Sequence, residues 1–126
     1  MELNVYSVII AMQEVIPIMR KQGAGMIINI NSGVSKRYVP GISAYSSTKY
    51  ALNAITSIAR QELKKENIIV SSVFPKVTLT KFNPHCITPL PDWSSFNGPM
   101  PPSNTGEEVA EKIAELIISE AEEIVL

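Results

Sequence analysis

Two short apolar runs, each lying directly after a long helical pattern, constrain the fold of this chain most. Residues 26–30 read Met-Ile-Ile-Asn-Ile and residues 68–73 read Ile-Ile-Val-Ser-Ser-Val, without alternation of apolar and polar side chains. Short runs of this kind are typical of strands buried on both faces of a parallel sheet. The sequence therefore predicts parallel strands over 26–30 and 68–73.

Three segments around these strands carry a helical pattern. Residues 2–22 are apolar on nearly every side, which predicts a helix buried on more than one face, with Pro17 bending its last turn. Residues 43–66 have one apolar face and predict a second helix. A third helix is predicted to about residue 121, with Thr105 as its N-cap and acidic residues in its first turn.

Strands and helices alternate along the chain, and residues 123–126 predict a last short strand. This order predicts an α/β layer fold with a parallel sheet and right-handed crossovers. Three strands are few for such a sheet, and no strand precedes the first helix. We therefore expect further strands upstream of this sequence, and a small complete α/β domain is the alternative.

Composition narrows the classes of function. The formal net charge is −1, which gives no electrostatic basis for binding nucleic acid. The single cysteine, Cys86, excludes an internal disulfide and a thiolate-rich zinc site, and it suits a reducing, cytoplasmic setting. The apolar residues 1–19 lack a basic leader and contain Glu2 and Asn4, so we expect neither a signal peptide nor a membrane span.

A phenol and an ammonium lie four residues apart in the segment Tyr45-Ser-Ser-Thr-Lys49. On a helix this spacing places both groups on one face, one turn apart. A nearby cation favours the phenolate, so Tyr45 could exchange a proton with a substrate oxygen near neutral pH. The pair by itself is a common match, and an ordinary surface pair is the alternative interpretation.

Ser32 lies thirteen residues before Tyr45, directly after the first predicted strand. Ligands of open α/β sheets bind outside the carboxyl ends of the strands. A hydroxyl at that place can donate a hydrogen bond to a developing oxyanion. The alternative role for Ser32 is to make a turn before Gly33.

These residues together resemble a known enzyme family. Asn4, Ile28-Asn-Ile-Asn-Ser-Gly33, Tyr45-Ser-Ser-Thr-Lys-Tyr-Ala51 and Val73-Phe-Pro-Lys-Val-Thr-Leu-Thr80 occur in the order and at the spacings of the short-chain dehydrogenases/reductases. The resemblance covers essentially the whole chain. It implies a Rossmann-like, doubly wound parallel sheet, of which residues 1–126 would form the C-terminal half of a single domain. It also implies NAD(P)-dependent interconversion of an alcohol and a ketone, with a 3-oxoacyl thioester or a small secondary alcohol as family-level substrates.

The resemblance implies roles for four catalytic residues. Tyr45 would be the general acid/base that protonates the carbonyl oxygen during reduction. Lys49 would favour the phenolate of Tyr45 and hydrogen-bond the nicotinamide ribose. Ser32 would orient and polarise the carbonyl, and Asn4 would hold a water that links Lys49 to solvent.

The resemblance also implies contacts to the nicotinamide end of NAD or NADP. Tyr45 and Lys49 would share them with Pro75, Val77, Thr78 and Thr80. The backbone after Pro75 would meet the carboxamide, and Thr80 would contact the phosphates. Lys76 stands where the family usually has glycine, and a lysine does not easily adopt a positive φ.

The family's Thr-Gly-x-x-x-Gly-x-Gly turn, which cradles the pyrophosphate, does not occur in these 126 residues. We therefore expect a C-terminal part of a longer enzyme that is inactive by itself. The residue that would choose between NAD and NADP is missing with the turn. The alternative is a truncated, non-catalytic fragment that acts only through its dimerisation helices.

The proline-rich segment at about 81–104 matches the family's substrate-binding loop and predicts a lid over the site. His85 and Cys86 lie in it without a third catalytic partner, so we expect ordinary loop residues there. The resemblance further implies a homodimer or homotetramer through helices 2–22 and 43–66. We expect a small alcohol or ketone as substrate, and no metal, nucleic acid or membrane as partner.

Overall fold

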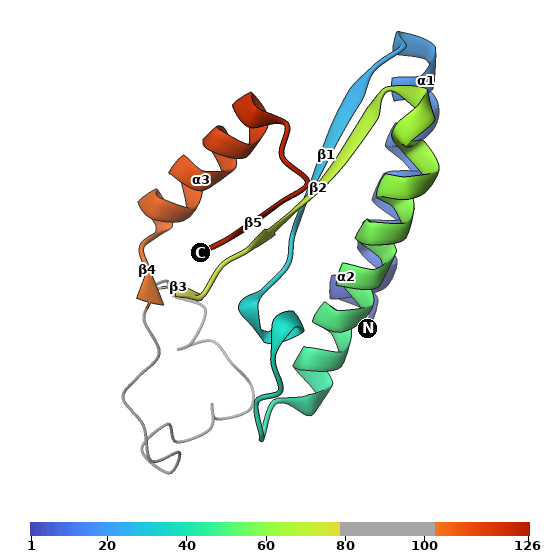
Figure 1. The fold of residues 1–126 in the computed structure, drawn as a ribbon. Helices are drawn as coiled ribbons and strands as arrows, with labels where there is room; N and C mark the ends of the chain where they lie inside the picture. Colours follow the sequence, from blue (N-terminus) through green and yellow to red (C-terminus); the bar gives the residue numbers. More distant parts are fainter. Residues whose placement is uncertain (79–102) are drawn as a thin grey trace.

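A three-stranded parallel sheet forms the centre of the molecule (Figure 1). The structure, a computed structural model, describes residues 1–78 and 103–126. The strand order is β1–β2–β5, with β1 at Gly25–Ile30, β2 at Ile68–Phe74 and β5 at Glu123–Val125. This sheet and its helices confirm the predicted α/β fold.

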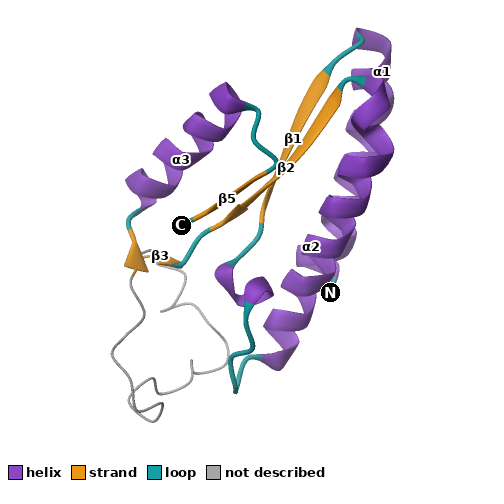
Figure 2. Ribbon diagram, in the orientation of Figure 1, coloured by secondary structure: helices purple, strands orange, loops and turns teal. Residues whose placement is uncertain are grey.

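Helices cover both faces of the sheet, as a doubly wound fold requires (Figures 1 and 2). Helix α1 (Ser7–Gln22) and helix α2 (Ser43–Leu63) lie on one face, and helix α3 (Gly106–Ser119) lies on the other. A π-helical turn, Glu2–Tyr6, extends α1 at its start, so helix covers the predicted range 2–22. A 3-10 turn, Lys64–Glu66, continues α2 to the predicted end of the second helix.

β2 is the central strand and the most deeply buried element. It pairs with β1 along its length, from Gly25 opposite Ile68 to Ile30 opposite Val73, and with β5 at its carboxyl end. Val73 has no exposed surface, whereas the side chains of the edge strand β1 are mostly half-buried. The burial of β2 therefore reflects cover on both faces, a full partner on one edge and a partner at its carboxyl end on the other.

The helix ends follow the signals in the sequence. Gly23 ends α1 in the left-handed conformation with φ 79°, and α1 continues through Pro17 to reach it. Thr105 caps α3: its hydroxyl accepts from the N–H of Glu108, and the Glu108 carboxylate accepts from the N–H of Thr105. α3 ends at Ser119, two residues before the predicted end.

A second, two-stranded parallel pair was not predicted. β3 (Val77–Thr78) pairs with β4 (Ser103–Asn104) just beyond the carboxyl end of β2. Ser103 and Asn104, at the end of the predicted loop over about 81–104, thus belong to a short strand. The rest of that loop, with Thr80, His85 and Cys86, lies outside the described residues.

Arg60 joins α2 to the part of β2 that precedes its pairing with β5. Its Nε donates to the carbonyl of Val70 at 2.7 Å, and its Nη2 donates to the carbonyl of Glu122 at 2.6 Å. Val70 has no exposed surface, so an unpaired carbonyl there would be costly. The Arg60 side chain thus pairs the carbonyl of Val70, and it shares the carbonyl of Glu122 with the N–H of Ser72.

The outer face of α1 is exposed in the single chain, whereas the sequence predicts a helix buried on more than one side. Leu3, Tyr6 and Ile10 are 83%, 59% and 58% exposed and recur at helical spacing. The helix over Glu2–Gln22 is long and apolar enough to span a membrane by length and composition, with a mean hydropathy of 1.2. The core helix of a soluble protein and a signal sequence meet the same criterion, and nothing in the described residues covers this face.

The capping box of α3 predicts a pH-dependent contribution to stability. Hydrogen bonds from the N–H of Thr105 and from the amide of Asn104 hold the pKa of Glu108 below its ordinary value of 4.5. A carboxylate favoured by folding stabilises the protein above pH 4.5, and this stabilisation is lost as pH falls through the lower folded pKa. We expect Glu108→Gln to lose less stability than the wild type between pH 7 and pH 3.

Thermal unfolding across that pH range measures the effect, and Glu107→Gln is the matched control because it removes the adjacent acid outside the box. The control should keep the wild-type pH dependence. Equal pH dependence in Glu108→Gln and the wild type would contradict this assignment.

Candidate active site

The hydrogen-bond ladder between β1 and β2 continues past the end of β1 and fixes Ser32. Asn31 donates its N–H to the carbonyl of Val73 at 2.8 Å, and Gly33 donates its N–H to the carbonyl of Pro75 at 2.9 Å. Ser32 lies between these two bonds in an extended conformation, with φ −162° and ψ 150°. The segments that follow β1 and β2 are therefore held together at one edge of the sheet.

The backbone of Ser32 is also held by its neighbours. Its N–H donates to the Oδ1 of Asn31 at 3.0 Å, and its carbonyl accepts from the hydroxyl of Ser35 at 2.8 Å. Its Oγ accepts from the N–H of Val34 at 3.4 Å, a long contact that opens the 3-10 turn Gly33–Lys36. The hydroxyl proton of Ser32 is not used in these bonds and can be donated to a ligand.

Lys49 links the helix α2 to the last residue of β1. Its Nζ donates to the carbonyl of Ile30 at 3.0 Å and lies 6.0 Å from the centre of the Tyr45 ring. Burial lowers the pKa of the Lys49 ammonium. The structure thus places the ammonium at the carboxyl end of β1 and near the ring of Tyr45, one helical turn away.

Asn4 reaches the same motif through Thr48. The Nδ2 of Asn4 donates to the Oγ1 of Thr48 at 3.1 Å, and that hydroxyl donates to the carbonyl of Tyr45 at 2.7 Å. Sequence reasoning did not assign a role to Thr48. The available signal was its place in the motif, three residues after Tyr45 and therefore on the same helix face.

Tyr50 holds the segment that connects the Ser32 turn to α2. Its ring stacks on that of Tyr38, with centres 5.6 Å apart and planes inclined by 10°. Near-parallel aromatic rings at this separation attract each other through their π-systems. The stack therefore restrains the connection between Ser32 and the helix that carries Tyr45.

The segment after β2 adopts an ordinary backbone in spite of Lys76. Among the described residues other than glycine, only Asn67 and Glu120 have a positive φ, so the strain expected at Lys76 does not arise. The N–H of Lys76 donates to the Oδ1 of Asn104 at 3.2 Å, and Val77 and Thr78 form β3. Pro75, Val77 and Thr78 therefore lie at the predicted edge of the sheet.

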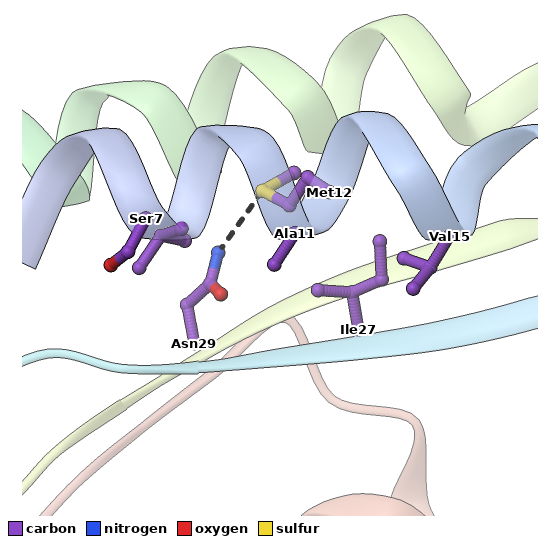
Figure 3. Close-up of a pocket in the computed structure, with 7 residues that line it drawn as sticks. Ser7, Ala11, Met12, Val15, Ile27 and Asn29 are labelled. Carbon is purple, nitrogen blue, oxygen red and sulfur yellow. Dashed lines mark hydrogen bonds between the residues drawn. The ribbon is translucent and has the colours of Figure 1, made fainter.

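A groove of about 300 Å³ lies elsewhere, between α1 and β1 (Figure 3). Its lining is largely apolar, with Met12, Val15 and Ile27 among its residues, and Asn29 supplies a polar group. The Nδ2 of Asn29 is bonded to the hydroxyl of Thr56 at 3.0 Å. None of the four predicted catalytic residues lines this groove, so it is separate from the candidate site.

Comparison with known proteins places these features in a family. The sequence is 38% identical over 79 residues to a 3alpha-hydroxysteroid dehydrogenase of Mediterraneibacter gnavus, which covers 63% of this chain and 32% of that protein. It is 42% identical over 79 residues to carbonyl reductase [NADPH] 2 of Sus scrofa, covering 62% of this chain and 32% of that protein.

Solved structures share the arrangement over nearly the whole chain. A short-chain dehydrogenase from Sphingobium yanoikuyae in complex with NADPH superposes with a TM-score of 0.83 and 22% identity, covering 98% of this chain and 45% of that one. This similarity shows a common fold. An acetoin dehydrogenase from Salmonella typhimurium superposes with a TM-score of 0.76 and 27% identity, covering 98% of this chain and 51% of that one.

The chain thus spans about a third of the length of these curated relatives and about half of the solved structures. The family model described as short chain dehydrogenase matches residues 1–88, which include Asn4, Ser32, Tyr45 and Lys49. Because that match covers well over half of the sequence, the chain belongs to the short chain dehydrogenase family.

Proposed function

We propose that this chain supplies the catalytic residues of an NAD(P)-dependent oxidoreductase that interconverts an alcohol and a ketone. The observation that carries the proposal is that Lys49 of α2 contacts the end of β1, the strand that leads to Ser32. Ser32 lies two residues after Ile30, and Lys49 donates to the carbonyl of Ile30 from the helix that carries Tyr45. The ammonium thus lies at the end of the strand that leads to Ser32, at the edge where ligands of α/β sheets bind.

In the direction of reduction, Tyr45 protonates the carbonyl oxygen and Ser32 donates a hydrogen bond to it. The Ser32 hydroxyl suits this role because its own bonds leave the proton free. Lys49 stabilises the phenolate that remains on Tyr45 after the transfer. Asn4 and Thr48 hold the backbone of Tyr45, so they position the acid without reacting.

The residues present fit the nicotinamide end of NAD or NADP. The Lys49 ammonium has three N–H donors and gives one to Ile30, which leaves donors for the hydroxyls of a ribose. The backbone of Val77 and Thr78 lies beside Pro75 at the same edge and can meet a carboxamide. A bound nicotinamide would supply the hydride that joins the carbonyl carbon, which completes the alcohol and leaves the cofactor oxidised.

The exposed stripe on α1 supports a second proposal, that the protein self-associates through α1 and α2. Leu3, Tyr6 and Ile10 form an apolar line on α1, and Ile58 of α2 is 55% exposed. Lone exposed apolar residues are common, but a continuous line along a helix marks an interaction face. A second copy of the same helices is the occupant we propose, in an isologous interface.

The division of roles between Tyr45 and Lys49 can be tested in the complete enzyme. Tyr45→Phe should abolish turnover with little loss of cofactor affinity, because only the proton donor is removed. Lys49→Ala should weaken both turnover and cofactor binding. Steady-state rates and cofactor titrations measure the two effects, and a near-normal rate in Tyr45→Phe would contradict the proposed mechanism.

Self-association predicts that Ile10→Arg shifts the protein toward monomer. A charge on the apolar line would be desolvated in the interface. Ile118→Arg places the same charge on α3, where Ile118 is 85% exposed, and should leave the assembly unchanged. Sedimentation at micromolar concentration measures both, and a monomeric wild type under these conditions would rule out the proposed interface.

The 126-residue chain by itself should not bind NADH or NADPH at micromolar concentration and should be inactive. Dinucleotides of this kind are held largely by a glycine-rich turn that cradles the pyrophosphate, and these residues contain no such turn. A few hydrogen bonds of about 0.5–1.5 kcal/mol each do not offset the entropy lost by so large a ligand. Calorimetric titration measures this, and saturable micromolar binding would show that the chain holds a cofactor unaided.

A further inference from the structure

The peptide group between Pro75 and Lys76 is held at both of its polar atoms. Its oxygen, the carbonyl of Pro75, accepts from the N–H of Gly33 at 2.9 Å. Its N–H, which belongs to Lys76, donates to the Oδ1 of Asn104 at 3.2 Å. Because a peptide group is planar and its two polar atoms point in opposite directions, these two bonds fix its rotation about the chain. The direction in which the backbone leaves β2 is therefore set from two sides.

The cap of α3 orients the amide of Asn104. The Nδ2 of Asn104 donates to the Oε2 of Glu108 at 3.3 Å, and the same oxygen accepts from the N–H of Thr105 at 2.9 Å. Because a carboxylate only accepts, it selects the amide orientation in which the nitrogen faces Glu108. The amide oxygen is then left to accept from the N–H of Lys76.

Backbone pairing extends this contact beyond Lys76. Val77 pairs with Ser103 and Thr78 pairs with Asn104, so β3 and β4 run side by side (Figure 1). Only Thr105 separates β4 from the first residue of α3. The segment after β2, which we propose to meet the carboxamide of the cofactor, is thus tied to the start of α3.

We propose that Asn104 is a positioning residue for the nicotinamide end of the cofactor and acts through the backbone of residues 76–78. The inference rests on the proposed function and adds to it a residue outside the catalytic set. A segment that is already held in place loses less conformational freedom when a ligand binds, which raises affinity. The effect of Asn104 is confined to the nicotinamide end, because the pyrophosphate is held by a different part of the fold.

The experiment compares two ligands of the complete enzyme that differ only in the nicotinamide. NADH or NADPH, whichever the enzyme binds, is titrated by calorimetry beside ADP-ribose or its 2′-phosphate. Asn104→Ala should weaken binding of the reduced dinucleotide about 3- to 10-fold, as expected for the loss of a hydrogen bond. Binding of the ligand without nicotinamide should stay unchanged, and it serves as the internal control for folding.

Three further variants separate positioning from packing. Ser103→Ala, the matched control, changes the exposed neighbour on the same strand and should leave both affinities unchanged. Asn104→Asp keeps an acceptor for Lys76 but places a second carboxylate against Glu108, so it should weaken dinucleotide binding as Asn104→Ala does. Adding Glu108→Gln to Asn104→Asp should recover affinity, because the glutamine amide can donate to Asp and still accept from Thr105.

Unchanged dinucleotide affinity in Asn104→Ala would overturn the proposal. An equal loss for the ligand without nicotinamide would also overturn it, because the change would then affect the fold as a whole. If the complete enzyme binds neither NADH nor NADPH, the proposed function fails instead. Amide hydrogen exchange then tests the contact separately: residues 75–78 should exchange faster in Asn104→Ala than in Ser103→Ala, and equal exchange would show that Asn104 does not hold this segment.

Discussion

The parallel ladder between β1 and β2 is the constraint on which the rest of this structure depends. Its bonds do not stop where the strands end: Asn31 and Gly33 still donate to Val73 and Pro75 in the same register. The candidate site is therefore built as an extension of the sheet. Backbone bonds join the segments after β1 and β2, and the side chains of Asn31 and Ser32 then fix the turn between them.

Packing of α1 and α2 on one face of the sheet fixes the positions of Tyr45 and Lys49 relative to the strands. Met12 of α1 and Ala59 and Leu63 of α2 pack in one buried cluster with Ile68 and Val70 of β2. Arg60 then bonds α2 to the carbonyl of Val70, and Lys49 bonds its other end to Ile30. α2 is thus attached to the sheet at two places, about three turns apart, and its position along the sheet is set by both.

Much of this architecture could be predicted from the sequence because burial leaves a periodic pattern. The two continuous apolar runs marked β1 and β2, and the cap at Thr105 marked the start of α3. The pairing of β3 with β4 could not be predicted, because two-residue strands carry no periodicity and their partners are far apart in sequence. The roles of Thr48 and Arg60 were missed for a related reason: each depends on which residue of another element lies opposite it.

The location of Ser32 between two ladder bonds has a consequence for how the site can fail. Side chains on a strand alternate between faces, so a shift of β1 by one residue would turn Ser32 to the opposite side of the sheet. Small continuous displacements of Ser32 are resisted by the bonds on either side of it. The hydroxyl is therefore either in place or lost with the pairing itself. Tyr45, carried by a helix, can drift gradually as packing loosens, so the two halves of the site tolerate disorder in different ways.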